Sequence, residues 1–213
     1  MQLDFEKTKK LLERYKLPLV KSVLVRKPGQ LVKLSKKIGF PLVLKISSTE
    51  AIHKSDIGGV KTGIENEEEL VKAYDDIIDN IKKKKIKIEG ALMQKMEHGK
   101  EIIVGMKRDP QFGATILFGL GGIFVEVLKD VSFRIAPVDK KEALDMIKEI
   151  KSYKVLEGAR GEKGVNIDAL VNVITKTSNM VLKNKKIAEL DFNPVIVDEK
   201  KAAIADARII VEK

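Results

Sequence analysis

Apolar residues recur along this chain with either the 3.6-residue period of a helix or the two-residue period of a strand. One helical segment follows Asn66 and Glu69, which are spaced as a capping box, and its apolar positions are Leu70, Ala73, Tyr74, Ile77, Ile78 and Ile81. Further helices are predicted over residues 5–15, 28–37, 139–150 and 167–182. Strands are predicted over residues 20–26, 41–46, 88–96, 101–107, 114–118, 123–128, 131–137, 187–197 and 202–209.

The order of these segments predicts an α+β protein. Helices and strands are mixed, and the run of successive strands from residue 88 to residue 137 indicates an antiparallel sheet. The sequence has no internal repeat, long linker or low-complexity tract. We expect two lobes with a boundary near Met96, so that residues 1–96 form the first and residues 97–213 the second.

Composition narrows the class of protein. Of the 213 residues, 44% are hydrophobic and 34% are charged, and no apolar run approaches the roughly 20 residues that span a bilayer. These proportions are typical of a soluble globular protein. The N-terminus carries no secretory signal, so we expect a cytoplasmic location. The absence of cysteine excludes disulfides, thiolate zinc sites and cysteine nucleophiles.

The net charge of +10 is compatible with nucleic acid, a membrane surface or a smaller phosphate-bearing ligand as partner. The densest basic run, residues 82–87, lies where a helix should give way to a strand, and we interpret it as a solvated turn. Aromatic residues make up only 5% of the chain, which argues against stacking on nucleic acid bases. Charge alone does not choose among these partners.

Two segments carry candidate phosphate chemistry. Lys45 interrupts an apolar strand, where it either meets a phosphate or points to solvent from an edge strand. His53 lies in a polar loop that leads into Gly58 and Gly59, and a neutral imidazole is a suitable nucleophile and leaving group near pH 7. The glycine pair alone is also typical of an ordinary turn, and His98, in Glu97-His98-Gly99, resembles an ordinary turn residue.

Two common nucleotide-binding motifs are absent. The chain has no Walker A pattern, and the glycine cluster at residues 119–122 lacks the G-x-G-x-x-G spacing and is flanked by predicted strands. Near the C-terminus, the interval from Asn193 to Asp206 suffices for one strand, a turn and a return strand, which would let these residues face one another. Their oxygens suit Mg²⁺, although surface acids are an alternative interpretation.

Taken together, these segments resemble the β subunits of ADP-forming acetate–CoA ligases. The resemblance rests on the segments LVLKI, HKSDIGGVKTG, RDPQFG, FGLGGIFVEVLKDVSFRIAP, LEGARGE and ELDFNP, which cover nearly the whole chain in order. A more distant likeness to the succinyl-CoA synthetase β subunit supports an ATP-grasp fold, with two α/β lobes enclosing a nucleotide site. The implied reaction converts acyl-CoA, phosphate and ADP into the free acid, CoA and ATP, through phosphohistidine.

The resemblance also implies roles for individual residues, with ATP or ADP and Mg²⁺ as cofactors. Lys45 would contact the nucleotide phosphates, and His53 would carry the phosphoryl group. Gly58, Gly59 and Val60 would form the phosphate-facing turn, and Gln94, Lys95 and Met96 would form the adenine-side hinge. Glu101 would lie near the ribose. Asn193 and Asp206 would bind the metal, with Asp191 nearby. Arg134 and Arg160 are further candidates for handling phosphate.

Some expectations depart from the family pattern or go beyond this chain. Relatives often carry an acid at the position of Lys95, which bears on the preference for ADP over GDP. The chain has no recognisable CoA-binding module, so the resemblance implies a separate CoA-binding α subunit, in a heterotetramer of two α and two β subunits. The alternatives are the nucleotide-binding part of another acyl-CoA ligase or acetyltransferase assembly, and a nucleotide-sensing module without phosphoryl transfer.

Overall fold

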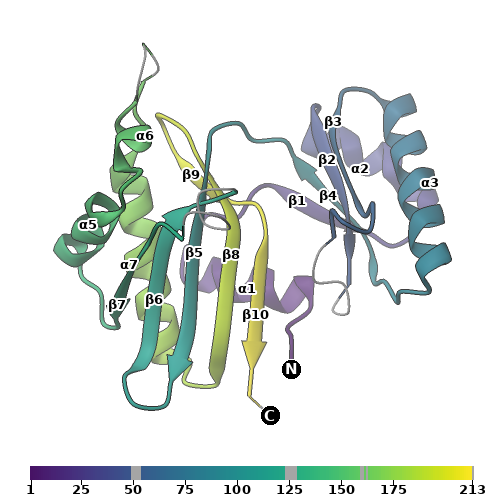
Figure 1. The fold of residues 1–213 in the computed structure, drawn as a ribbon. Helices are drawn as coiled ribbons and strands as arrows, with labels where there is room; N and C mark the ends of the chain where they lie inside the picture. The colour runs from purple at the N-terminus through teal and green to yellow at the C-terminus, as the bar shows by residue number, and fades with distance from the viewer. Residues whose placement is uncertain (49–53, 123–128, 159–160, 162, 213) are drawn as a thin grey trace. The chain divides into compact units, whose positions relative to one another are not determined.

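The predicted amphipathic segments form two α+β units in the structure, which is a computed structural model (Figure 1). The structure describes residues 1–48, 54–122, 129–158, 161 and 163–212. The larger unit comprises Met1–Leu19 and His98–Lys213, and the smaller unit comprises Val20–Glu97. Within the described residues, no helix combines the length and the apolar character needed to cross a membrane.

The smaller unit is a four-stranded antiparallel sheet with two helices on one face. Its strand order is β1-β4-β2-β3. Leu44 and Ile46 of the sheet are buried in one apolar cluster with Leu70 and Ile77 of α3. In chain order the elements are β1 (Ser22–Val25), the short 3₁₀ helix η1 (Pro28–Gln30), α2 (Leu31–Ile38), β2 (Leu42–Ser47), β3 (Val60–Ile64), α3 (Glu67–Lys84) and β4 (Gly90–Lys95).

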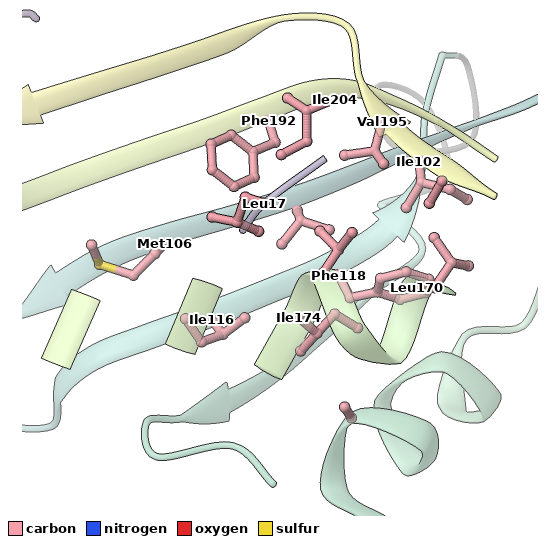
Figure 2. Packing of buried hydrophobic residues seen from close by; sticks show 14 of the residues in the cluster. Leu17, Ile102, Met106, Ile116, Phe118, Leu170, Ile174, Phe192, Val195 and Ile204 are labelled. Carbon is pink, nitrogen blue, oxygen red and sulfur yellow. The ribbon is translucent and has the colours of Figure 1, made fainter. Parts of the chain in front are cut away.

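The larger unit is a six-stranded antiparallel sheet in the order β10-β8-β5-β6-β7, with β9 paired to β8. Helices α1, α5 and α7 contribute to the single apolar cluster that covers one face of this sheet. Figure 2 shows Phe118 and Phe192 of the sheet in the same cluster as Leu170 and Ile174 of α7. In chain order the elements are α1 (Phe5–Arg14), β5 (Lys100–Asp109), β6 (Gly113–Leu120), β7 (Val131–Ile135), α5 (Lys140–Glu149), α6 (Tyr153–Glu157), α7 (Ile167–Lys183), β8 (Ile187–Val197), β9 (Ala202–Ile204) and β10 (Ala207–Val211).

The predicted helix caps and the predicted antiparallel pairing are confirmed. The side chain of Asn66 accepts a hydrogen bond of 2.9 Å from the N–H of Glu69 at the start of α3. Asp139 and Glu142 form a reciprocal capping box at the start of α5. All the paired strands that the structure describes in both sheets are antiparallel. The α+β class expected from the sequence is therefore confirmed.

Several element boundaries differ from the predictions. The predicted helix over residues 28–37 is divided into η1 and α2. Helix α3 continues through Lys84 into the basic run that we interpreted as a turn, because lysine forms helices well and basic residues suit a helix C-terminus. The predicted strand over residues 202–209 is divided into β9 and β10, because the N–H groups of Ala205 and Asp206 donate to the carbonyl oxygen of Pro194.

Two elements were not predicted, and one prediction lies outside the described residues. Strand β3 is the edge of its sheet and alternates weakly between polar and apolar residues, so its sequence resembles a loop. Helix α6 has only five residues, which is too short for a helical period to be visible. The strand expected over residues 123–128 lies outside the residues that the structure describes.

The two units differ in extent from the two expected lobes. Their boundary near residue 97 lies close to the expected one, but the first 19 residues belong to the larger unit. Leu12 and Leu17 are buried in the larger core, and the N–H of Leu3 donates a hydrogen bond of 2.9 Å to the carbonyl oxygen of Ile209. Nonlocal pairing of this kind has no signature in the pattern of a short N-terminal helix.

Candidate functional site

Lys45 is buried on the face of the smaller sheet that points away from α2 and α3. Its neighbours Leu44 and Ile46 point into the core, so strand alternation puts Lys45 on the opposite face. The side chain is only 6% exposed, and the strand is internal to the sheet, which makes the solvent-facing interpretation wrong. Lys45 pairs with Leu92 of β4. Gln94 follows Leu92 by two residues, so it lies on the same face as Lys45, and it is 3% exposed.

Gly58 and Gly59 form a tight turn that leads into β3. The N–H of Gly58 donates a hydrogen bond of 2.9 Å to the carbonyl oxygen of Ser55, and the N–H of Gly59 donates one of 2.8 Å to the carbonyl oxygen of Lys54. A Cβ on Gly59 would lie 3.1 Å from the side chain of Ile46, so glycine permits close packing against β2. These two N–H groups are used within the turn, which gives the glycines a conformational role.

The segment expected to contact the adenine base is held firmly at the end of β4. The N–H of Lys95 donates a hydrogen bond of 2.9 Å to the carbonyl oxygen of Lys21, and the N–H of Met96 donates one of 3.0 Å to the carbonyl oxygen of Pro41. The ammonium group of Lys95 bonds the carbonyl oxygens of Gly39, at 3.2 Å, and of Phe40. The Lys95 side chain therefore holds this segment against the turn after α2. The N–H groups of Lys95 and Met96 already donate to other backbone groups.

The larger sheet has a second face, opposite α1, α5 and α7, which we call the outer face. Strand alternation defines it, because residues that alternate with its members on β5, β6, β8 and β10 lie in the apolar core, and the members on β7 follow from its register with β6. Its polar members on β8 and β10, and immediately before β10, are Glu189, Asp191, Asn193, Asp206 and Arg208. On β5 the outer face carries Glu101, Gly105 and Lys107, and on β6 and β7 it carries Leu117, Phe133 and Ile135.

Asn193 and Asp206 lie opposite one another, as the spacing predicted. The N–H of Asn193 donates a hydrogen bond of 3.2 Å to the carbonyl oxygen of Asp206. Asp191 precedes Asn193 by two residues on β8, so its side chain emerges from the same face. The backbone thus brings three oxygen-bearing side chains to one end of the outer face.

The charges around Asp191 favour a cation. Burial raises the pKa of Asp191, the guanidinium of Arg208 opposes this rise, and the carboxylates of Asp206 and Glu189 add to it. Arg208, Asp206 and Glu189 therefore all lie close enough to Asp191 to influence its charge. Within the described chain no three His, Asp or Glu side chains form a closed metal cage. Asp191, Asn193 and Asp206 fit Mg²⁺ in the open manner that this ion favours, with few protein ligands beside water and phosphate.

Arg134 and Glu101, two further candidate ligand contacts, lie on different strands and on opposite faces of the larger sheet. Glu101 is exposed near the start of β5, and its carbonyl oxygen accepts a hydrogen bond of 2.7 Å from Gly121. Arg134 alternates with the outer-face residues Phe133 and Ile135, so it emerges on the helix side of β7. Its guanidinium bonds Glu149 of α5 at 2.6 Å and the carbonyl oxygen of Phe133 at 2.7 Å. These contacts give Arg134 a structural role at the sheet edge.

Other candidate residues fall elsewhere. His53, the expected phosphoryl carrier, and Arg160 lie outside the residues that the structure describes. His98 is exposed in the turn between β4 and β5, in agreement with its interpretation as a turn residue. Arg208 was not predicted as a site residue, although its position two residues after Asp206 would place both side chains on one face of a strand.

The sequence matches the model of the ATP-grasp domain family over residues 1–211. This match covers nearly the whole chain, including both units. The chain belongs to the ATP-grasp family. Among its relatives is the β subunit of acetate–CoA ligase [ADP-forming] I from Pyrococcus furiosus, which is 48% identical over 95% of this chain and 89% of the relative. The family expected from the sequence is therefore confirmed, and this close relative is a ligase.

Longer relatives and solved structures extend the comparison. The 4-hydroxybutyrate–CoA ligase [ADP-forming] of Nitrosopumilus maritimus is 49% identical over 96% of this chain, which spans only 30% of that protein. Acetyl-coenzyme A synthetase 1 of Ca. Korarchaeum cryptofilum, in complex with coenzyme A and Ca-AMPCP, matches 99% of this chain and 93% of its own chain, with 44% identity and a TM-score of 0.95. The ATP-grasp fold is thus confirmed by structure as well as by sequence.

A second structure of the same Korarchaeum enzyme bears on the ligands. It contains coenzyme A and Mg-AMPPCP, and its phosphohistidine segment is described as pointing towards the nucleotide binding site. This structure matches 99% of the present chain and 92% of its own chain, with a TM-score of 0.85 and 44% identity. Nucleotide and Mg²⁺ binding are consistent with this family.

Proposed function

We propose that this chain is the nucleotide-binding subunit of an ADP-forming acyl-CoA synthetase and that His53 carries a phosphoryl group to ADP. One observation carries the proposal: a relative that matches 99% of this chain holds Mg-AMPPCP and has a phosphohistidine segment. This chain has two histidines, and His53 lies in the segment HKSDIGGVKTG on which the family resemblance rests. The proposed overall reaction is acyl-CoA, ADP and phosphate to acid, ATP and CoA.

The transfer step exchanges one bond to phosphorus for another. An oxygen of the terminal ADP phosphate forms a P–O bond while the P–N bond to the His53 imidazole breaks. The electron pair of the P–N bond stays on the imidazole nitrogen, which takes up a proton from solvent. In such transfers the protein contributes mainly positioning and electrostatic stabilisation, which is the role we assign to the residues of both units.

In the smaller unit, Lys45 is the proposed phosphate contact. Lys45 is a buried residue, and burial of a cation is less costly when an anion or polar partner meets it. Gln94, Lys95 and Met96 form the proposed base-side segment, in which the Lys95 side chain holds the segment in place. We propose that Gly58, Gly59 and Val60 determine the shape of the turn that leads into β3, since the N–H groups of both glycines bond within this turn.

In the larger unit, Asp191, Asn193 and Asp206 are the proposed ligands of Mg²⁺. The ion, when bound, supplies positive charge that neutralises the nucleotide phosphates. Glu101 is the proposed ribose contact, and strand alternation along β5 puts it on the same outer face as Gly105. Arg134 is left out of the proposed site, because its guanidinium is paired with Glu149 on the helix side of the sheet.

The acyl substrate is proposed only as a class. Relatives with 48% and 49% identity are named for acetate and for 4-hydroxybutyrate, so similarity does not choose between these acids. Two of the relatives are separate β subunits. In two others, the match to this chain covers only 30% of the relative's length. We therefore propose a CoA-binding α partner, in a heterotetramer of two α and two β chains, testable by copurification and light scattering.

Phosphohistidine formation tests the central proposal. The purified chain, with and without its α partner, is incubated with γ-labelled ATP and Mg²⁺, and the protein-bound label is tested in acid and alkali. The expected label is acid-labile, alkali-stable, absent from His53→Ala and retained in the matched control His98→Ala. If no label appears even with the partner present, the chain is a nucleotide-binding module without phosphoryl transfer.

A further inference from the structure

Arg208 lies on the outer face among the proposed metal ligands. It belongs to β10 and pairs in register with Asp191 of β8. It follows Asp206 by two residues, so the two side chains emerge on the same face. A permanently charged guanidinium is thus placed between carboxylates that we propose to bind a cation.

The residues that the structure describes satisfy the guanidinium of Arg208 only in part. Nη1 lies 3.8 Å from Oε1 of Glu189, which is an ion pair but too long for a hydrogen bond. Nε is buried and has no hydrogen-bond partner within the residues that the structure describes. Buried donors are nearly always paired in native proteins, so an unpaired Nε favours an acceptor that a ligand supplies.

The charges on this face indicate the chemistry of that ligand. Glu189, Asp191 and Asp206 offer carboxylates to a cation, while Arg208 offers N–H donors to an anion. If Arg208 served only to neutralise the carboxylates, hydrogen-bond distances to them would be expected instead of the 3.8 Å contact. A phosphate group that carries a divalent cation satisfies both halves of the face, because it combines the two charges.

We infer that Arg208 binds a phosphate oxygen of the cation-bound nucleotide. This inference rests on the proposed nucleotide-binding function and adds a phosphate contact on the strand that follows Asp206. The guanidinium fork suits phosphate oxygens, and charge-assisted bonds of this kind are stronger than neutral ones.

The test uses opposite effects on an anion and a cation. Arg208→Gln removes the positive charge, so ADP affinity measured by calorimetry with Mg²⁺ should fall about 10- to 100-fold. Binding of free Mn²⁺, measured by electron paramagnetic resonance without nucleotide, should stay equal or become tighter, because a repelling charge has been removed. Arg208→Lys retains the charge but loses the fork, and should bind ADP with intermediate affinity.

Lys107→Gln is the matched control, because Lys107 lies on the same outer face opposite Glu189 and is exposed. It removes the same charge, and its ADP affinity should stay within about threefold of wild type because exposed charges are screened. If Arg208→Gln and wild type bind ADP equally, or if ADP and Mn²⁺ binding both weaken, the inference is overturned. Absence of ADP binding by the wild type would instead overturn the proposed function.

Discussion

The backbone N–H of Asn193 donates a hydrogen bond to the carbonyl oxygen of Asp206 across 3.2 Å. This bond joins the end of β8 to the residue that immediately precedes β10, so neither side chain depends on a long loop for its position. Sites on paired strands are held more accurately than sites on loops. The proposed metal ligands therefore have a rigid backbone support.

Asp206→Asn should weaken the effect of Mg²⁺ on nucleotide binding. Loss of one carboxylate ligand should reduce the Mg²⁺-dependent gain in ADP affinity about 10-fold or more. Calorimetry with and without Mg²⁺ measures this gain. Asp145→Asn, at an exposed position on α5, is the matched control. An unchanged Mg²⁺ response in a folded Asp206→Asn variant would remove this residue from the proposed metal site.

Lys45→Met should weaken ADP binding while preserving the fold. The substitution removes the buried ammonium group but keeps an unbranched side chain of similar length, so affinity should fall about 10- to 100-fold. Lys61→Met is the control, because Lys61 lies on edge strand β3 and pairs with Asp76 at 3.1 Å. Equal affinities in the two variants would contradict a phosphate contact by Lys45.

Phe118→Ala should destabilise the larger unit, because Phe118 is fully buried in the core that Figure 2 shows. The expected loss in the free energy of unfolding is about 3–5 kcal/mol. Phe112→Ala removes the same side chain at a position that is 60% exposed, and should change stability by less than about 0.5 kcal/mol. Denaturant unfolding of both variants, followed by circular dichroism, makes this comparison.

Acid should destabilise the larger unit in part through Asp130. Burial opposes ionisation of this carboxyl, but hydrogen bonds from the Ser152 hydroxyl and from the N–H groups of Lys151 and Ser152 outweigh it and lower its pKa. A lowered pKa in the folded state gives stability above the unfolded pKa that is lost as pH falls through the folded pKa. The stability of Asp130→Asn should therefore depend less steeply on pH below about 4. Denaturant unfolding at several pH values tests this, and parallel wild-type and variant curves would contradict it.

Sequence patterns predicted what local chemistry determines. The caps at Asn66 and Asp139 follow from residue type and spacing, and the opposition of Asn193 and Asp206 follows from the length of a strand, a turn and a return strand. The role of Arg134 could not be predicted in this way. Whether it emerges on the helix side or the outer face depends on the register of β7, which its exposed neighbours Phe133 and Ile135 obscure.

Side-chain partners distant in sequence were also beyond prediction. The residue type of Lys95 indicates a charge at the end of β4, but its carbonyl partners at Gly39 and Phe40 are more than 50 positions away. Arg208 could have been found from its two-residue spacing to Asp206. Only the folded structure shows that its Nε meets no acceptor among the described residues. Periodicity indicates which face a residue occupies but does not identify the group that it meets there.

The two ends of the chain are paired with one another in the larger unit, as Figure 1 shows. The N–H of Val211 donates a hydrogen bond of 2.9 Å to the carbonyl oxygen of Met1, and Gln2 forms a bridge with Ile210. During synthesis the smaller unit, which is continuous in sequence, can therefore fold while the larger one still awaits its last strand. A circular permutant that joins the present ends by a short linker and opens the exposed turn near Phe112 should retain the same fold.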